Sequence, residues 1–141
     1  MPPPEFTYTE KSFAKDFASL NVIFEFVGSF CTSNGLDEAQ AFSIKFSVEE
    51  VFTNMVKYNP GHTDVVIFLA REGKTLKVGF VDHEEKPFDI TSGKEVDPNL
   101  PIEERKPGGL GIFLIKKMMD RVEYAHDGVH SRITLTKYVE Q

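Results

Sequence analysis

The chain contains one cysteine, no tryptophan and no long apolar run. Cys31 has no second cysteine to pair with, which excludes an internal disulfide, and no Cys/His spacing typical of a zinc site occurs. No apolar run approaches the roughly 20 residues that a membrane-spanning helix needs. The first residues lack the basic and apolar segments of a signal peptide. These absences predict a cytoplasmic protein with no membrane association.

Positive charge is also in short supply. The 16 Lys and Arg residues face 22 Asp and Glu residues, for a net charge of -6, whereas general nucleic-acid binding needs a basic surface. A nucleotide needs only a few local positive groups, so nucleotide binding stays open. With 40% hydrophobic and 27% charged residues, the chain is predicted to form a single folded domain over residues 1–141.

Hydrophobic periodicity predicts the order strand, two helices, two strands, a long irregular segment, one helix and two strands. The expected ranges are a strand over 5–9, a helix over 13–33, a helix capped by Asp37 and ending near 58, strands over 64–70 and 75–81, a helix ending near 120, and strands over 122–126 and 131–139. Phe13, Phe17 and Phe42 are assigned to the apolar faces of the first two helices. The pair Asn34-Gly35 is expected to end the first helix.

Two predicted hairpins decide the fold class. An all-parallel sheet needs a helix between every pair of consecutive strands, and the hairpins exclude that arrangement. The prediction is an α+β protein, a two-layer α/β sandwich in which a mixed, mostly antiparallel sheet carries its helices on one face. Cys31 lies in an apolar helical pattern and is expected to be a buried structural thiol.

A glycine-rich segment precedes the last predicted helix. It contains Gly108, Gly109 and Gly111, with Leu110 between them, and it follows Lys106. A glycine-rich turn at the start of a helix presents unpaired backbone N–H groups and the positive end of the helix dipole, which together suit a phosphate. The alternative is a mobile loop with a flexible helix start, because glycine clusters often mark turns.

Two upstream segments add polar groups. Glu50 and Asn54 are four residues apart in the second predicted helix and so share one face, where an acid and an amide can hold a magnesium ion or its waters. Asp82 ends the second hairpin strand and can accept a hydrogen bond from the amino group of a base. The alternatives are a solvated Glu49-Glu50 pair, a surface amide at Asn54 and a turn that starts at Asp82.

These segments, in this order, resemble the ATP-binding domain shared by histidine kinases and gyrase-type ATPases, the GHKL or Bergerat fold. Within it, the chain is most similar to the stand-alone anti-sigma-factor serine/threonine kinases. The resemblance covers residues 6–138 and implies ATP and Mg²⁺ as cofactors. The Glu50-x-x-x-Asn54 and Gly-Gly-Leu-Gly motifs carry it.

The resemblance also implies a role for each motif residue. Asn54 is the expected magnesium ligand, and Glu50 is the acid that orients or deprotonates the attacking hydroxyl. Asp82 is the expected adenine-reading aspartate. The expected lid around the triphosphate consists of Gly108, Gly109, Leu110 and Gly111. Arg105 or Lys106 is assigned to the γ-phosphate, with a solvated lid charge as the alternative.

One position departs from the family pattern. The family has Asp-x-Gly after the strand, whereas this chain has Asp82-His83-Glu84. Glycine lets the backbone approach a nucleotide closely, and Glu84 instead brings a side chain and a negative charge. The expected consequence is a different bend of the loop or a weaker affinity for nucleotide. Pro87-Phe88-Asp89 again matches the family pattern.

Three functions follow as expectations. The first is a serine/threonine kinase that uses Mg-ATP to phosphorylate a small anti-sigma-factor antagonist domain, with a sigma factor or another regulator as the competing partner. The second is a nucleotide-binding interaction module with little or no phosphoryl transfer. The third, an interaction domain without ATP, conflicts with the intact Glu50, Asn54 and glycine motifs. A homodimer is left open, since related domains self-associate through the sheet or the first helix.

Overall fold

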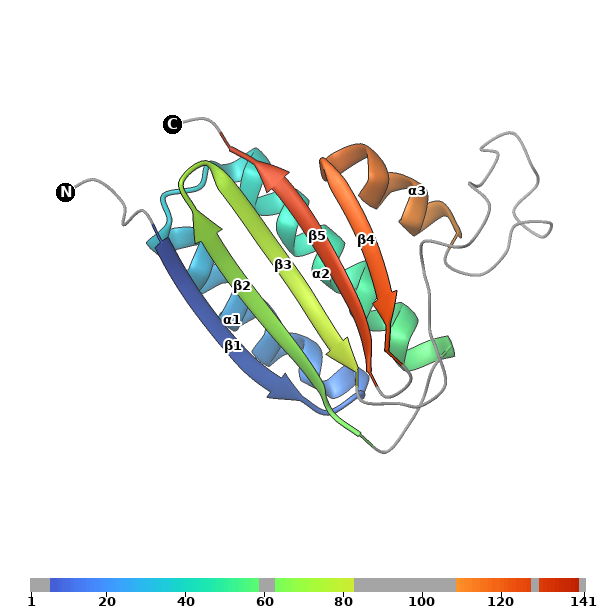
Figure 1. The fold of residues 1–141 in the computed structure, drawn as a ribbon. Coiled ribbons are helices and arrows are strands. Elements are labelled where there is room, and N and C mark those ends of the chain that lie inside the picture. Colours follow the sequence, from blue (N-terminus) through green and yellow to red (C-terminus); the bar gives the residue numbers. More distant parts are fainter. Residues whose placement is uncertain (1–5, 59–62, 83–108, 128–129, 140–141) are drawn as a thin grey trace.

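The computed structural model describes residues 6–58, 63–82, 109–127 and 130–139. The elements, in chain order, are β1 (Phe6–Phe13), the short 3-10 helix η1 (Phe17–Ser19), α1 (Leu20–Ser33), α2 (Glu38–Tyr58), β2 (Val65–Glu72), β3 (Thr75–Asp82), α3 (Gly109–Met118), β4 (Arg121–His126) and β5 (Ser131–Tyr138). Figure 1 shows a single sheet with α1 and α2 behind it. The predicted order of elements and the two-layer fold class are confirmed.

The sheet has five strands in the order β1-β2-β3-β5-β4. Every neighbouring pair of these strands is antiparallel, so the described sheet is more uniform than the mixed sheet that was expected. The predicted hairpin joins β2 to β3, and Gly73 adopts a φ of 59° at its turn, where a side chain would be strained. No described helix is both long and apolar enough to cross a membrane.

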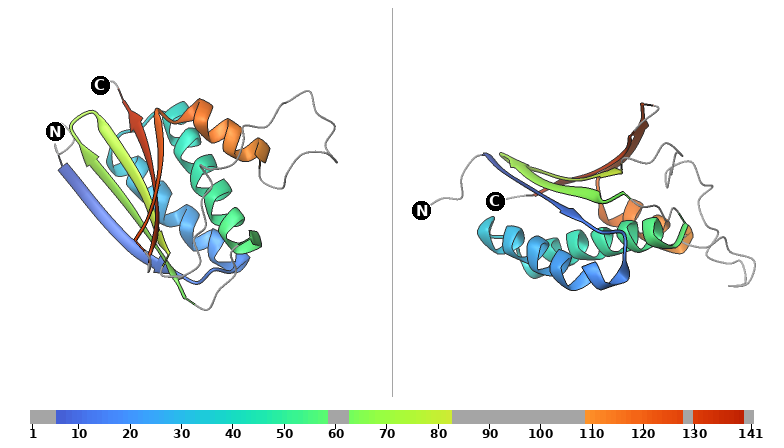
Figure 2. Two further views of the ribbon diagram at one scale, coloured as in Figure 1. Left: turned by 45° about the vertical axis from the view of Figure 1, so that its right-hand side comes forward. Right: turned by 90° about the horizontal axis from the view of Figure 1, so that it is seen from below.

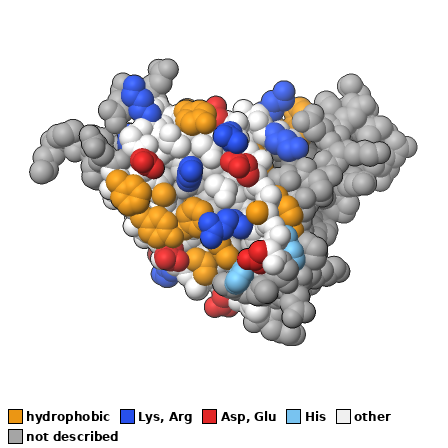
Figure 3. All heavy atoms as spheres, in the orientation of Figure 1, with side chains coloured by type: hydrophobic (Ala, Val, Ile, Leu, Met, Phe, Trp, Pro, Cys, Tyr) orange, Lys and Arg blue, Asp and Glu red, His pale blue; other side chains and the backbone are white. Residues whose placement is uncertain are grey.

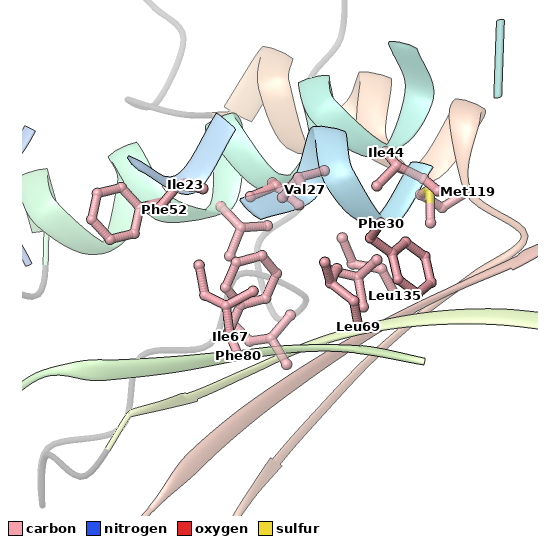
Figure 4. Packing of buried hydrophobic residues seen from close by; sticks show 14 of the residues in the cluster. Ile23, Val27, Phe30, Ile44, Phe52, Ile67, Leu69, Phe80, Met119 and Leu135 are labelled. Carbon is pink, nitrogen blue, oxygen red and sulfur yellow. The ribbon is translucent and has the colours of Figure 1, made fainter. Parts of the chain in front are cut away.

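The hydrophobic core lies between the sheet and the two long helices (Figure 2). Side chains of α1 and α2 point toward those of the strands in Figure 4. Fully buried contributors include Ile23, Val27, Ile44, Phe52, Ile67, Phe80 and Leu135. Burying each such side chain stabilises the fold by about 1.5–3 kcal/mol relative to leaving it exposed. Cys31 is buried as predicted, and burial raises the pKa of its thiol, partly offset by the charge of Lys45.

The predicted start of the first helix is wrong. Phe13 is the last residue of β1 and pairs with Val65, so the first strand is longer than expected. Asp16 then accepts a hydrogen bond from the Ala18 N–H at 2.8 Å, which caps η1 and delays the start of α1 to Leu20. Phe17 therefore falls outside the helix face and is 48% exposed.

The assignment of Phe42 to the apolar face of the second helix is also wrong, since its side chain is 58% exposed. Its ring stacks on that of Phe46, one turn further along α2, with centroids 6.0 Å apart. The rest of α2 agrees with the prediction. Asp37 and Gln40 hold its start, because each side chain accepts a hydrogen bond from the other residue's backbone N–H, at 2.8 and 3.0 Å.

The end of α1 is held by Arg71 of β2. As predicted, α1 ends at Asn34 and Gly35, and Gly35 has a φ of 64°. The buried Arg71 guanidinium donates to the Asn34 carbonyl at 2.7 Å and to the Gly73 carbonyl at 2.9 Å. A cation at this point also complements the negative end of the helix dipole. Arg71 thus ties the C-terminus of α1 to the β2–β3 turn.

The other face of the sheet is turned to the viewer in Figure 3, where hydrophobic and charged side chains are interspersed. Phe68 lies over Gly79 of the neighbouring strand, whose missing side chain leaves room for the ring. Tyr8 stacks on Phe68 with centroids 6.0 Å apart, and the Arg132 guanidinium lies 5.7 Å from the same ring. These cross-strand contacts stabilise β1, β2 and β5 against one another.

Replacing Arg71 with Met is expected to lower the free energy of unfolding by about 1.5–3 kcal/mol, because the buried Asn34 carbonyl and the Gly73 carbonyl both lose a charged donor. Urea unfolding followed by circular dichroism measures the change. Arg121→Met is the matched control, since Arg121 is exposed and lies 3.5 Å from an exposed Glu123; its expected effect is within about 0.5 kcal/mol. Equal effects of the two substitutions would contradict this role of Arg71.

Candidate functional site

The position of α2 is fixed by an apolar stripe that faces the sheet. Its fully or almost fully buried members are Ile44, Val48, Val51, Phe52 and Met55. Glu50 and Asn54 lie beside this stripe, one helical turn apart, so the packing of the stripe determines where both polar groups point. Both residues lie within α2, so the prediction that they share one helix face is confirmed.

Glu50 packs directly on Gly111, at the start of α3. A Cβ atom placed on Gly111 would overlap the Glu50 carboxylate, with its Cδ at 2.7 Å and its Cγ at 3.3 Å. Only a residue without a side chain allows this approach. The structure therefore brings the acid of α2 and a glycine of the predicted phosphate segment into contact, although the two are far apart in the sequence.

The rest of α3 is anchored to the core. Ile115 and Met119 are buried, and the Lys137 ammonium donates to the Met118 carbonyl at 2.9 Å, at the end of the helix. A cation at this end also complements the helix dipole. With its C-terminal end held by β5, α3 packs against α2, where Gly111 meets Glu50. Figure 2 shows the two helices side by side.

Asn54 is buried, with 5% of its surface exposed. Its side-chain amide makes no hydrogen bond within the part of the chain that the structure describes. Buried polar groups are normally paired, so an amide in this state is available for a ligand. An amide oxygen is a suitable ligand for Mg²⁺, which takes one or two protein groups and completes its shell with water and phosphate. Asn54 and Glu50 thus fit the magnesium that the sequence predicts.

The row of polar residues on α2 is longer than expected. Ser47 is fully buried, and its hydroxyl has no hydrogen-bond partner among the described residues. It precedes Glu50 by three residues and Asn54 by seven, which places all three on one side of the helix. A small polar residue in an otherwise apolar run was the sequence signal for this extension.

The two acids of the Glu49-Glu50 pair differ in their surroundings. Glu49 is exposed, whereas Glu50 is partly buried. Burial raises the pKa of the Glu50 carboxyl, the charge of Glu49 raises it further, and the charge of Lys57 lowers it. A carboxylate that is destabilised by burial has a greater tendency to take up a proton, which is the property required of a general base. The alternative that both acids are solvated therefore holds for Glu49 and not for Glu50.

Asp82 forms a second group of contacts, at the end of β3. Its side chain is fully buried, and its two carboxylate oxygens lie 3.0 and 3.1 Å from the ammonium of Lys15. The Thr63 hydroxyl donates to one of these oxygens at 3.4 Å. Asp82 is the last residue of β3, where it pairs with Val65 and Ser131, and the residues that would form a turn after it lie outside the described part of the chain.

The structure places the other predicted residues as follows. Gly109 and Leu110 open α3, so the helix begins inside the glycine motif rather than after it. Arg105, Lys106, Gly108, His83 and Glu84 lie outside the described residues.

Sequence reasoning missed Lys15 and Thr63. Lys15 fell within the range predicted for the first helix, 13–33, and no role was assigned to it. The sequence offered no signal for its position, because Phe6 and Tyr8 lie on one face of the strand whereas Phe13 lies on the other, so the apolar alternation does not extend to Phe13. Because Phe13 pairs with Val65 and Val65 with Asp82, a residue just after Phe13 lies near Asp82.

Comparison with known proteins identifies the family of this chain. The family model described as "Histidine kinase-like ATPase domain" matches residues 13–137. The chain belongs to this family. The matched range includes α2, β3 and α3, and thus every described residue of the candidate site. Only the part of β1 that precedes Phe13 and the residues after 137 lie outside it among the described elements.

The relatives found in sequence carry one name. Proteins called "Serine-protein kinase RsbW" are 34% identical over 105 residues in Halalkalibacterium halodurans, 28% over 104 residues in Bacillus cereus and 29% over 113 residues in Listeria monocytogenes. These alignments cover 70% of this chain and 62%, 64% and 66% of the relatives. The chain thus spans less than two thirds of the length of these relatives. The resemblance to the anti-sigma-factor kinases is confirmed.

A solved structure supports the fold. The crystal structure of the RsbU and RsbW domains of Rv1364c from Mycobacterium tuberculosis superposes with a TM-score of 0.69 at 11% sequence identity. The match covers 96% of this chain and 33% of that one. At this level of identity, the likeness concerns the fold alone.

Replacing Gly111 with Ala is expected to displace the Glu50 carboxylate, because the new methyl group would occupy its place. The carboxylate is the end of a flexible side chain, so the free energy of unfolding should change by no more than about 1 kcal/mol. Carbon-13 NMR of the Glu50 carboxyl group should show its pKa falling toward the ordinary value as it moves into solvent.

The control is Gly28→Ala in α1, where the new methyl group would have a single neighbour, Lys45, at 3.9 Å. It is expected to stabilise the protein by about 0.5–1 kcal/mol through helix propensity and to leave the Glu50 signal unchanged. An unchanged Glu50 pKa in Gly111→Ala would contradict the contact.

Glu50→Gln is expected to stabilise the folded protein at neutral pH. The raised pKa means that the folded state holds the proton more tightly than the unfolded state does, so ionised Glu50 lowers the free energy of unfolding. The difference between variant and wild type should be absent below the ordinary pKa of 4.5, grow as the pH rises, and level off above the raised pKa. Urea unfolding at several pH values measures it. Glu25→Gln, at an exposed position of α1, should stay within about 0.5 kcal/mol throughout.

Proposed function

We propose that this protein binds Mg-ATP and transfers the γ-phosphoryl group to a serine or threonine of a small anti-sigma-factor antagonist protein. A sigma factor or another regulator would then compete with the antagonist for the same protein. The printed name of the sequence relatives, serine-protein kinase, supports the reaction type. The family match supports the nucleotide.

The observation that carries the proposal is the contact between Glu50 and Gly111. Phosphoryl transfer requires an acceptor for the hydroxyl proton next to the donors that surround the phosphates. In this chain, the acid with the raised pKa lies against the helix start that has the glycine motif. The backbone N–H groups of that helix start, including those of Gly109 and Gly111, are the proposed phosphate donors.

Each remaining residue has a proposed part in the reaction. Asn54 holds Mg²⁺, which neutralises charge on the phosphates when it is bound. Asp82 accepts a hydrogen bond from the amino group of adenine. Glu50 accepts the proton of the substrate hydroxyl. As it does so, the hydroxyl oxygen bonds to the γ-phosphorus, the bond between the γ-phosphorus and the oxygen that bridges it to the β-phosphate breaks, and ADP is released. Lys106, Gly108 and Leu110 complete the proposed lid with Gly109 and Gly111.

A nucleotide-binding interaction module with little or no transfer is the second candidate. The sequence observation behind it is Glu84, which stands where the family has a glycine and adds negative charge next to Asp82. In this case, nucleotide would serve as a structural or sensing ligand, and partner binding would be the function.

A transfer assay with labelled Mg-ATP and candidate antagonist domains separates the two. Glu50→Gln is expected to reduce transfer by at least about 100-fold, the range of general base catalysis, while ATP affinity stays within about threefold. Glu49→Gln is the matched control, because Glu49 is adjacent but exposed, and it should retain transfer. Asn54→Ala should weaken the binding of Mg-ATP itself.

The outcomes divide clearly. Transfer that is lost in Glu50→Gln but retained in Glu49→Gln supports the kinase. Binding of ATP without transfer to any antagonist domain favours the module. A thermal midpoint that millimolar Mg-ATP and Mg-ADP leave unchanged would reject both, since a ligand that binds the folded state must stabilise it.

A further inference from the structure

Lys15 and Asp82 form an ion pair away from α2. The Lys15 ammonium lies 3.0 and 3.1 Å from the two oxygens of the same carboxylate, and neither side chain has any exposed surface. Charges are seldom buried to this extent unless they are paired. Lys15 therefore holds both oxygens of the residue that we assign to the base.

The backbone around Lys15 is fixed on both sides. β1 ends at Phe13, which pairs with Val65 of β2, and Val65 in turn pairs with Asp82 of β3. After Lys15, the Ser19 hydroxyl donates to the Ala14 carbonyl at 2.8 Å, and the Asp16 N–H donates to the same carbonyl at 2.8 Å. The lysine thus projects from a hydrogen-bonded turn that places its ammonium before any ligand is bound.

The ion pair restricts what the carboxylate can do. A carboxylate presents about four acceptor positions in its plane, so its rotation about the side-chain bond decides which of them face a ligand. An ammonium that contacts both oxygens fixes this rotation. Thr63 adds a contact from the residues just before β2.

We propose that Lys15 is a positioning residue for purine recognition. It orients the Asp82 carboxylate so that the carboxylate accepts a hydrogen bond from the exocyclic amino group of adenine. This inference rests on the proposed binding of ATP and assigns the choice of base to a pair of residues rather than to Asp82 alone. Lys15 acts through Asp82, so its loss should affect nucleotides that carry the amino group far more than those that lack it.

The test compares ATP with purine riboside triphosphate, which lacks only the amino group. Wild-type protein should bind ATP at least about tenfold more tightly by isothermal titration calorimetry in magnesium buffer. Lys15→Met should reduce this ratio to about twofold or less, and Lys15→Arg, which keeps the charge, should restore most of it. Lys11→Met, at an exposed lysine of β1, should leave the ratio unchanged.

The ratio distinguishes positioning from a merely structural role, which would weaken both nucleotides equally. Should Lys15→Met fail to fold, Lys15→Gln keeps a hydrogen-bond donor without the charge and is expected to lower the ratio as well. A tenfold preference that survives in Lys15→Met or Lys15→Gln overturns the inference but leaves the proposed function intact. Absence of ATP binding in the wild type overturns both.

Discussion

The candidate site depends on the close approach of Glu50 to Gly111. Helices usually pack through interlocking side chains at interaxial distances of about 8–10 Å. Here, a glycine on α3 lets a carboxylate of α2 occupy the space of a side chain. The contact fixes the acid relative to the backbone N–H groups at the start of α3. It also buries part of the acid, and that burial raises its pKa.

The supporting structure is distributed over the whole fold. The apolar stripe of α2 presses the helix on the sheet and sets its rotation, while Lys137 holds the far end of α3. Within this apolar setting, Ser47 and Asn54 are buried polar residues that apolar side chains could replace with a gain in packing. Such local conflicts with core composition are typical of functional sites, where stability is given up for a ligand.

The sequence was a good guide where a pattern repeats within one element. The hairpin, the capping of α2 by Asp37 and the shared face of Glu50 and Asn54 all follow from local spacing. The start of the first helix was mispredicted because Phe13 and Phe17 are four residues apart and imitate a helical stripe, although Phe13 belongs to a strand. Phe42 was misplaced because it lies two residues before the buried Ile44, a spacing that puts it on the opposite side of α2 from the apolar stripe.

Contacts between elements could not be predicted from local sequence patterns. The overlap of Gly111 with Glu50 depends on how two helices approach, and the contact of Lys15 with Asp82 depends on the register of three strands. A shift of one residue in either strand pairing would turn every side chain of that strand to the opposite face. The hydrophobic residues that fix this register, such as Val65 and Phe80, are fully buried. The core therefore does more than stabilise the fold, since the same packing that holds the strands in register also aligns the lysine with the carboxylate that we assign to the base.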